Sequence, residues 1–131
     1  NLISVLHLFC ILVTGAFGLT CLGFVLAWKL DSVHGFHAIM NLLLMPMWLL
    51  SGAFFPIPEL TAQSSVGQMM IHWLMKLDPL TYVVSLVRQV MYESQQADRF
   101  WQPDIGTSWF VTLLFCAVMF VIACRVVKQR K

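Results

Sequence analysis

Two histidines near the start of an apolar segment are the side chains best placed for metal chemistry in this sequence. His34 and His37 are three residues apart, a spacing that puts both on one face of a helix. A zinc site needs three or four ligands, and only the Asp31 carboxylate is close enough in the sequence to supply a third. His7 and His72 are isolated, and we interpret them as interfacial or hydrogen-bonded side chains. The sequence therefore predicts no metal site.

Motifs for covalent or hydrolytic chemistry are also absent from the sequence. It contains no H-E-x-x-H, no G-x-S-x-G and no G-x-x-x-x-G-K-[ST] phosphate-binding loop. The four cysteines all lie within apolar stretches, where cysteine behaves as a small packed hydrophobic side chain. We therefore expect no catalytic, cofactor-binding or metal-binding residues. Any ATP hydrolysis that serves this chain must occur on another polypeptide.

The composition indicates that lipid surrounds the chain. Of its 131 residues, 60% are hydrophobic and 11% are charged, whereas an average soluble domain is about 25% charged. A water-soluble fold of this size has no means of burying so much apolar surface. The formal net charge is only +2, and no basic stripe alternates with aromatic residues. Nucleic acid is therefore excluded as a partner, and membrane lipid is expected.

Three apolar stretches are long enough to cross a bilayer: about residues 2–28, 36–55 and 105–124. About 20 helical residues span a hydrocarbon core of about 30 Å. The first stretch ends at Lys29, the second at Pro56 and the third at Arg125. We expect three transmembrane helices with these approximate bounds.

Small and polar residues within the first two spans predict contacts with other helices. Those of the first span allow close approach of a neighbouring helix: Thr14, Gly15, Gly18, Gly23 and Ala27. In the second span, Pro46 removes a backbone hydrogen bond and is expected to kink the helix. Asn41 lies about one turn before it. Two interpretations remain open for Asn41 and Pro46: a polar face that lines a path or a dimer interface, or an amide hydrogen bond between packed helices.

The segment between the second and third spans is too apolar for an ordinary loop. Four apolar residues occupy one helical stripe at spacing i, i+3, i+4, i+7: Met70, Trp73, Leu74 and Leu77. Asp78 is suited to cap a second helix, and Pro79 suits its first turn. That helix, about residues 80–92, is about 20 Å long and too short to cross. We therefore expect a re-entrant or interfacial hairpin at about residues 68–92.

These elements define the expected fold: an all-α membrane protein with three transmembrane helices and a pair of short re-entrant or interfacial helices between the second and third. Arg88 lies at the edge of the second short helix. Its alternatives are contact with lipid headgroups, pairing with an acid, or snorkelling to the water boundary.

The distribution of charge predicts the orientation in the membrane. The tail carries four bases and no acid: Arg125, Lys128, Arg130 and Lys131. Such a tail favours the cytoplasm. The segment at residues 56–104 then lies outside, and it has more acids (Glu59, Asp78, Glu93, Asp98 and Asp104) than bases (Lys76, Arg88 and Arg99).

Two short motifs flank the apolar hairpin. The first motif, residues 51–56, reads Ser51-Gly52-Ala53-Phe54-Phe55-Pro56, and the second motif, residues 78–82, reads Asp78-Pro79-Leu80-Thr81-Tyr82, followed by Arg88. Their order and spacing between spans resemble the C-terminal half of the transmembrane domain of a type-2 ABC transporter permease. That family has Ser-Gly-x-x-Phe-Pro-like and Asn-Pro-Leu-Thr-Tyr-like elements. Asp78 stands where asparagine is usual, and either residue caps a helix.

The resemblance implies a membrane-spanning permease subunit of an ATP-driven exporter in the bacterial cytoplasmic (inner) membrane. It implies two partners: an ABC ATPase subunit, which binds the ATP, and a second permease copy or homologous half. Methionine and phenylalanine in the second span suit a hydrophobic or amphipathic cargo. Since the chain begins at Asn1 rather than methionine, we expect the N-terminal half of the domain to be missing from it.

Two other functions are compatible with the residues. A non-transport membrane scaffold or assembly factor would use the small-residue faces to pack against other helices. An intramembrane enzyme would need a catalytic group from the missing half.

Overall fold

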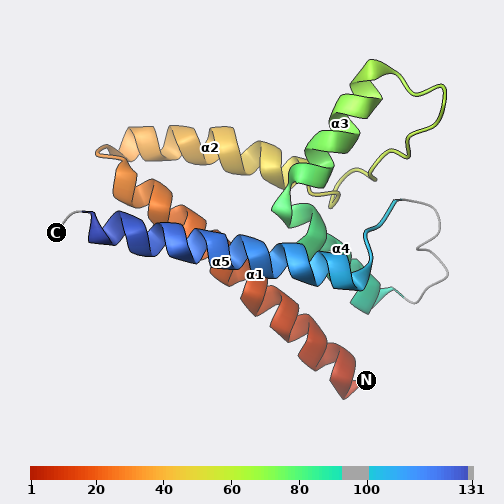
Figure 1. Ribbon diagram of the computed structural model, residues 1–131, viewed down its shortest axis with the longest axis horizontal. Coiled ribbons are helices and arrows are strands. Elements are labelled where there is room, and N and C mark those ends of the chain that lie inside the picture. Colours follow the sequence, from red (N-terminus) through yellow and green to blue (C-terminus); the bar gives the residue numbers. More distant parts are fainter. Residues whose placement is uncertain (93–100, 130–131) are drawn as a thin grey trace.

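The computed structural model describes residues 1–92 and 101–129, and over these residues it is entirely helical apart from connecting segments. Figure 1 shows the five helices in chain order: α1 (Leu2–Lys29), α2 (Val33–Leu50), α3 (Val66–Leu77), α4 (Pro79–Met91) and α5 (Ile105–Lys128). Three of them, α1, α2 and α5, are long and apolar enough to cross a membrane. The predicted fold class is therefore confirmed.

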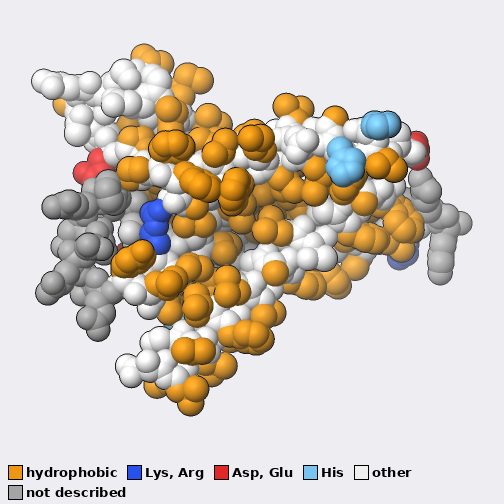
Figure 2. Space-filling view, turned by 180° about the vertical axis from the view of Figure 1, so that it is seen from behind, with side chains coloured by type: hydrophobic (Ala, Val, Ile, Leu, Met, Phe, Trp, Pro, Cys, Tyr) orange, Lys and Arg blue, Asp and Glu red, His pale blue; other side chains and the backbone are white. Residues whose placement is uncertain are grey.

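Apolar side chains cover the middle of the molecule. On the face shown in Figure 2, the charged side chains lie towards the two ends, and hydrophobic side chains occupy the surface between them. Many large apolar residues of α1 and α5 are exposed, including Phe9 and Phe120. Exposed apolar surface of this extent is what hydrocarbon requires of a membrane-spanning helix.

The packed core lies where α1, α4 and α5 meet (Figure 1). Two glycines of α1 allow this packing. A Cβ atom at Gly18 would lie 2.9 Å from Phe115 and Cys116 of α5, and one at Gly15 would lie 3.0 Å from Val83 of α4. At these two positions, the small residues of the first span thus allow close packing against other helices of the same chain. No atom lies within 4 Å of a Cβ built at Gly23, so the described residues leave that position open.

Polar contacts join α1 to α5 along the same packed face. The indole N–H of Trp109 donates to Nε2 of His7 over 3.2 Å, and the two rings are stacked. The Cys116 thiol donates to the carbonyl oxygen of Thr14 over 3.1 Å. His7 is therefore hydrogen-bonded, which was one of the two alternatives considered from the sequence.

Helix α2 lies apart from this core. None of its residues is buried, and it contacts the other helices only sparsely. Figure 1 shows α2 joined to α1 through a short turn at one end and to the α3–α4 pair at the other. At its start, the Ser32 hydroxyl accepts the backbone N–H of Gly35 over 3.0 Å, a side-chain cap that the polar turn provides.

Several helix ends differ from the bounds expected from the sequence. Helix α2 begins at Val33, before the expected residue 36, and α5 continues to Lys128, beyond the expected residue 124. Helix α2 ends at Leu50, not at Phe55, because Gly52 adopts a left-handed conformation with φ of 80° that breaks the helix. Helix α3 begins at Val66, before the expected residue 68, because Ser65 and Gln68 form a capping box with reciprocal side-chain hydrogen bonds. The α3–α4 hairpin therefore comprises Val66–Met91 with a sharp break at Asp78.

Candidate functional site

The first motif forms the turn that leaves α2. The Ser51 hydroxyl donates to the carbonyl of Trp48 over 2.7 Å, and the backbone N–H of Ala53 donates to the same hydroxyl over 3.4 Å. Gly52 follows in the left-handed region, which L-residues with a side chain rarely adopt. Serine and glycine are thus used for different reasons, one for its hydroxyl and one for its backbone conformation. Phe55 and Pro56 lie beyond the turn and are exposed.

The second motif closes the end of α3 and opens α4. One oxygen of Asp78 accepts the backbone N–H of Leu80 over 2.9 Å, and Pro79 takes the first helical position, where no N–H is needed. The Thr81 hydroxyl donates to the carbonyl of Met75 over 2.6 Å. Helix ends leave such carbonyls without partners inside the helix. The motif therefore caps two helices at once, with Asp78 serving α4 and Thr81 serving α3.

Tyr82 completes this closure from the next position. Its hydroxyl donates to the carbonyl of Lys76 over 2.9 Å. Burial raises the pKa of the Tyr82 hydroxyl above its ordinary value. The hydroxyl therefore stays protonated at neutral pH and remains a donor.

The two motifs contact each other directly. Nη2 of Arg88 on α4 donates to the carbonyl oxygen of Gly52, and the Thr81 hydroxyl lies 3.4 Å from the carbonyl oxygen of Leu50. Thr81 and Arg88 are seven residues apart and so share one face of α4. We call this contact region, residues 50–52 with 78–82 and Arg88, the motif junction. It fixes the end of α2 against the α3–α4 hairpin.

Arg88 has a partner in the structure that was not among the alternatives considered from the sequence. Its guanidinium group donates to the backbone carbonyl of Gly52 and is half-buried, so lipid contact and snorkelling to the water boundary stay predictions. A guanidinium group has five N–H donors and no acceptor, so a carbonyl is a suitable partner. Nothing in a sequence marks which carbonyl oxygen a distant arginine will reach.

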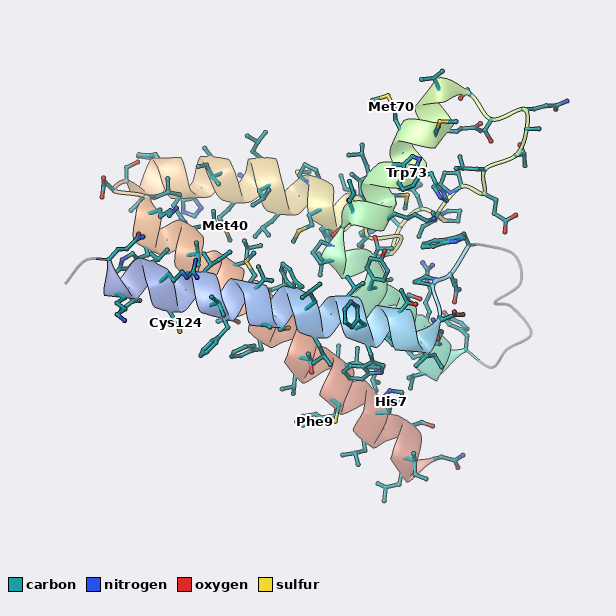
Figure 3. All side chains as sticks on the ribbon, in the orientation of Figure 1. His7, Phe9, Met40, Met70, Trp73 and Cys124 are labelled. Atoms are coloured by element: carbon teal, nitrogen blue, oxygen red, sulfur yellow. The ribbon has the colours of Figure 1, made fainter. Side chains whose placement is uncertain are left out.

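A second set of contacts holds the connection between the motifs against α3. Nδ1 of His72 lies 2.7 Å from the carbonyl oxygen of Pro58, and the ring packs edge-on against Trp101. The Lys76 ammonium lies 4.5 Å from the centroid of the Trp101 ring and 5.4 Å from that of Trp73. Figure 3 shows Trp73 on α3. The His72 interpretation as a hydrogen-bonded side chain holds, but its partner has no signal in the sequence.

Asn41 and Pro46 are not part of the motif junction. Both lie on α2 with exposed side chains, and the helix continues through Pro46 to Leu50. The expected kink at Pro46 stays a prediction. His34 and His37 are likewise exposed on the first turns of α2, and the described residues contain no group of three or more potential metal ligands.

Asp78 is the one buried acid of the motif junction. Its side chain is only 7% exposed, and its Oδ2 atom has no hydrogen-bond partner among the described residues. Burial raises the pKa of the Asp78 carboxyl from 3.8 to about 7, although the hydrogen bond from Leu80 opposes the change.

The comparison with known families bears on this whole region. The model of the ABC-2 type transporter membrane family matches residues 2–92, which include α1 to α4 and both motifs. The chain belongs to this family. No curated protein and no solved structure matches the chain of this ABC-2 type permease. The family match establishes that the protein is the membrane component of a transporter.

The motif junction lies within the part of this permease that the family model matches. It is the place where one candidate membrane span, α2, is attached to the hairpin that packs on the other two, α1 and α5. The attachment uses a half-buried, charge-assisted hydrogen bond between α4 and the turn that leaves α2.

Proposed function

We propose that this ABC-2 type permease is the membrane-spanning subunit of an ATP-driven exporter and corresponds to the C-terminal half of a permease transmembrane domain. A separate ABC ATPase subunit binds and hydrolyses the ATP. A second permease copy or homologous half completes the path. The family supplies the general role, and the arrangement of α2 and the motif junction supports the finer proposal.

The hydrogen bond from Arg88 to the Gly52 carbonyl carries the proposal. Helix α2 has no buried residue, so it does not pack along its length against α1 and α5. Its attachment at the motif junction therefore determines how a displacement of α2 reaches the α3–α4 hairpin. A permease that alternates access needs such a stiff connection between elements that move relative to each other.

The exposed side chains of α2 support a hydrophobic or amphipathic cargo. Large apolar residues occur along the helix, among them Leu42, Met45 and Trp48. Asn41 is exposed near the middle of the same helix, where hydrocarbon offers it no hydrogen-bond partner. We propose that Asn41 and Pro46 lie on the face of α2 that lines the translocation path or meets the second permease half.

We further propose a cytoplasmic C-terminus and an α3–α4 hairpin on the outer side of the bacterial inner membrane. Arg125 and Lys128 lie in the last turn of α5, and α3 and α4 connect to the opposite end of that helix. Basic residues favour the cytoplasmic side. Five charged residues of that argument lie outside the described residues: Glu93, Asp98, Arg99, Arg130 and Lys131.

The test is reconstitution of the permease with a candidate ABC ATPase subunit that is identified by co-purification. The complex is placed in liposomes, and ATP hydrolysis and ATP-dependent movement of a fluorescent amphipathic dye are measured together. We expect the permease to change the ATPase rate and to support dye movement. An ATPase mutant that binds but does not hydrolyse ATP is the negative control. An ATPase rate that is indifferent to the permease, with no dye movement, would refute the proposal.

A matched pair of variants tests the role of the motif junction in the same assay. We expect Arg88→Met to reduce dye movement while the complex still assembles, because the tie to Gly52 is lost. Met91→Leu is the control, since Met91 is exposed on the same helix. Equal transport by both variants would show that the junction does not couple the elements.

A further inference from the structure

The break between α3 and α4 contains a carboxyl group with one oxygen that is buried and unpartnered. Oδ1 of Asp78 accepts the backbone N–H of Leu80, but Oδ2 has no donor among the described residues. Only 7% of the side chain is exposed. An ionised carboxylate has about four lone-pair directions to satisfy, and one hydrogen bond leaves most of them empty.

The cations of the hairpin are engaged elsewhere. On α3, the Lys76 ammonium lies over the rings of Trp73 and Trp101. On α4, Arg88 donates to the Gly52 carbonyl. A cation beside Asp78 would favour its charged form, and the charged groups of these two helices do not supply one.

Among the residues that the structure describes, the other titratable groups around the hairpin do not supply a counter-charge either. On α1, His7 accepts a hydrogen bond from Trp109, and Lys29 lies in the last turn. His72 of α3 is directed to the carbonyl oxygen of Pro58, and Tyr82 of α4 donates to the carbonyl of Lys76. Helix α2 contains no aspartate, glutamate, lysine or arginine, and its two histidines lie in its first turns, at the end away from the junction. On α5, the two bases are in the last turn, also far from the hairpin, and the Asp104 cap carries the same charge sign as Asp78.

The helix ends have opposing effects on a charge at this position. Asp78 sits at the N-terminus of α4, which favours a negative charge, but also at the C-terminus of α3, which disfavours it. The carbonyls of Met75 and Lys76 lie in that last turn of α3 and point towards the second motif, where Thr81 and Tyr82 donate to them. A neutral carboxyl group avoids this repulsion and converts one oxygen from an acceptor into a donor.

We propose that Asp78 is a proton-binding site: the closed α3–α4 break holds its side chain as a neutral acid, and release of the proton to water loosens the motif junction. The burial-induced rise in the pKa of Asp78 to about 7 agrees with this geometry. The proposal does not rest on ATP-driven export, because the proton equilibrium exists in the permease alone.

The direction of the pH effect follows from linkage. In an opened, hydrated break the pKa of Asp78 returns towards 3.8, and in the closed break it is about 7. Below the lower value both forms are neutral, so the closed form keeps its full stability. As the pH rises from the lower value to the higher one, the open form gains stability relative to the closed form. Above about pH 7 the closed form has lost all the stability that depends on this proton, and the balance between the two forms no longer changes with pH.

The test measures the accessibility of a cysteine placed at Met75, which is buried beside the break. Exposed Cys10 and Cys124 are first replaced by serine. A membrane-impermeant maleimide is applied across about pH 4.5 to 8.5, a range on either side of the ordinary and raised values. Rates are divided by those of a Met91→Cys variant, which is exposed, so that the titration of the thiol itself cancels.

With Asp78 present, we expect the normalised labelling rate to rise about tenfold between about pH 5 and 7.5, within the linkage limit of about tenfold per pH unit. With Asp78→Asn, which imitates the neutral acid, the rate stays low throughout. The same pH dependence in both proteins, or a flat rate with Asp78, overturns the proposal. If Met75→Cys does not fold, a Ser85→Cys reporter replaces it.

Infrared spectroscopy of the permease without a reporter provides a second readout. The carbonyl stretching band of a protonated carboxylic acid persists at about pH 6, where exposed acids are ionised. We expect this band to titrate near the raised pKa and to be absent from Asp78→Asn. Absence of the band from the unsubstituted protein at that pH would overturn the proposal even if the variant did not fold.

Discussion

Removal of the Arg88 guanidinium group tests the motif junction most directly. Methionine keeps the length and apolar stem of the side chain but cannot donate to the Gly52 carbonyl. That carbonyl belongs to a buried residue in a left-handed turn. In Arg88→Met the carbonyl oxygen is left without its donor, and the end of α2 loses its attachment to α4.

The size of the effect follows from the type of bond. A hydrogen bond from a charged donor contributes about 1.5–3 kcal/mol net, because the loss includes the cost of a buried acceptor without a partner. The contact at 3.4 Å between the Thr81 hydroxyl and Leu50 is longer than the other bond of that hydroxyl and does not replace the lost one. We therefore expect the free energy of unfolding to fall by about 2 kcal/mol, which is about a 30-fold change in the equilibrium constant.

The assay is reversible unfolding of the purified permease in mixed micelles, followed by tryptophan fluorescence. Trp48 packs edge-on against Phe54 beside the first motif and reports on this region. Met91→Leu is the matched control on the same helix and is expected to change the free energy by less than about 0.5 kcal/mol, as is usual for surface substitutions. Arg88→Lys is expected to lie between the two, because its single ammonium group reaches the carbonyl less well.

Spin labels at Phe55 and Met91, both exposed, add a structural readout. In Arg88→Met the distribution of distances between them should broaden, since the two elements are no longer tied. The reasoning is refuted if Arg88→Met unfolds with the same free energy as Met91→Leu and the distance distribution stays narrow.

Three further substitutions probe the α1–α5 contact, one of them as a control. Gly18→Leu should destabilise the protein by more than about 2 kcal/mol, because a Cβ atom at that position would lie 2.9 Å from side chains of α5. The control Gly23→Leu has no neighbour within 4 Å and should be nearly neutral in thermal unfolding. Equal melting temperatures of the two variants would contradict the close packing of α1 on α5. Trp109→Phe keeps an aromatic ring but removes the donor to His7, and we expect a loss of about 1 kcal/mol by the same measurement. An unchanged melting temperature for Trp109→Phe would show that the ring packing alone accounts for this contact.

Local features of this permease were predictable because their causes are local. Hydrophobic length indicated the long helices, and Asp78 followed by Pro79 indicated the start of a helix, since capping and proline preferences act within one turn. The end of α2 was placed too late because hydrophobicity continues through Phe55, whereas the helix is ended by the left-handed conformation of Gly52. Hydropathy carries no information about the sign of φ.

The partners of the junction residues were not predictable in the same way. Arg88 was considered beside lipid, acid or water, yet it donates to a carbonyl 36 positions earlier in the chain. His72 was regarded as isolated, yet it lies against the Pro58 carbonyl. Every residue except proline offers the same backbone groups, so a carbonyl acceptor has no signature in the side-chain sequence.

The amino-acid sequence alone determined that this protein resides in lipid, that it forms three long helices and a short pair, and that its two motifs resemble those of a permease. The transfer of apolar side chains into lipid and the capping of helices depend on residues that are neighbours in the sequence, so the order of residues predicts both. Only the tertiary structure brought the two motifs together and buried Asp78 with one oxygen that has no hydrogen-bond partner among the described residues. Those outcomes depend on how α2, α3 and α4 converge in space, and packing between distant segments decides that convergence.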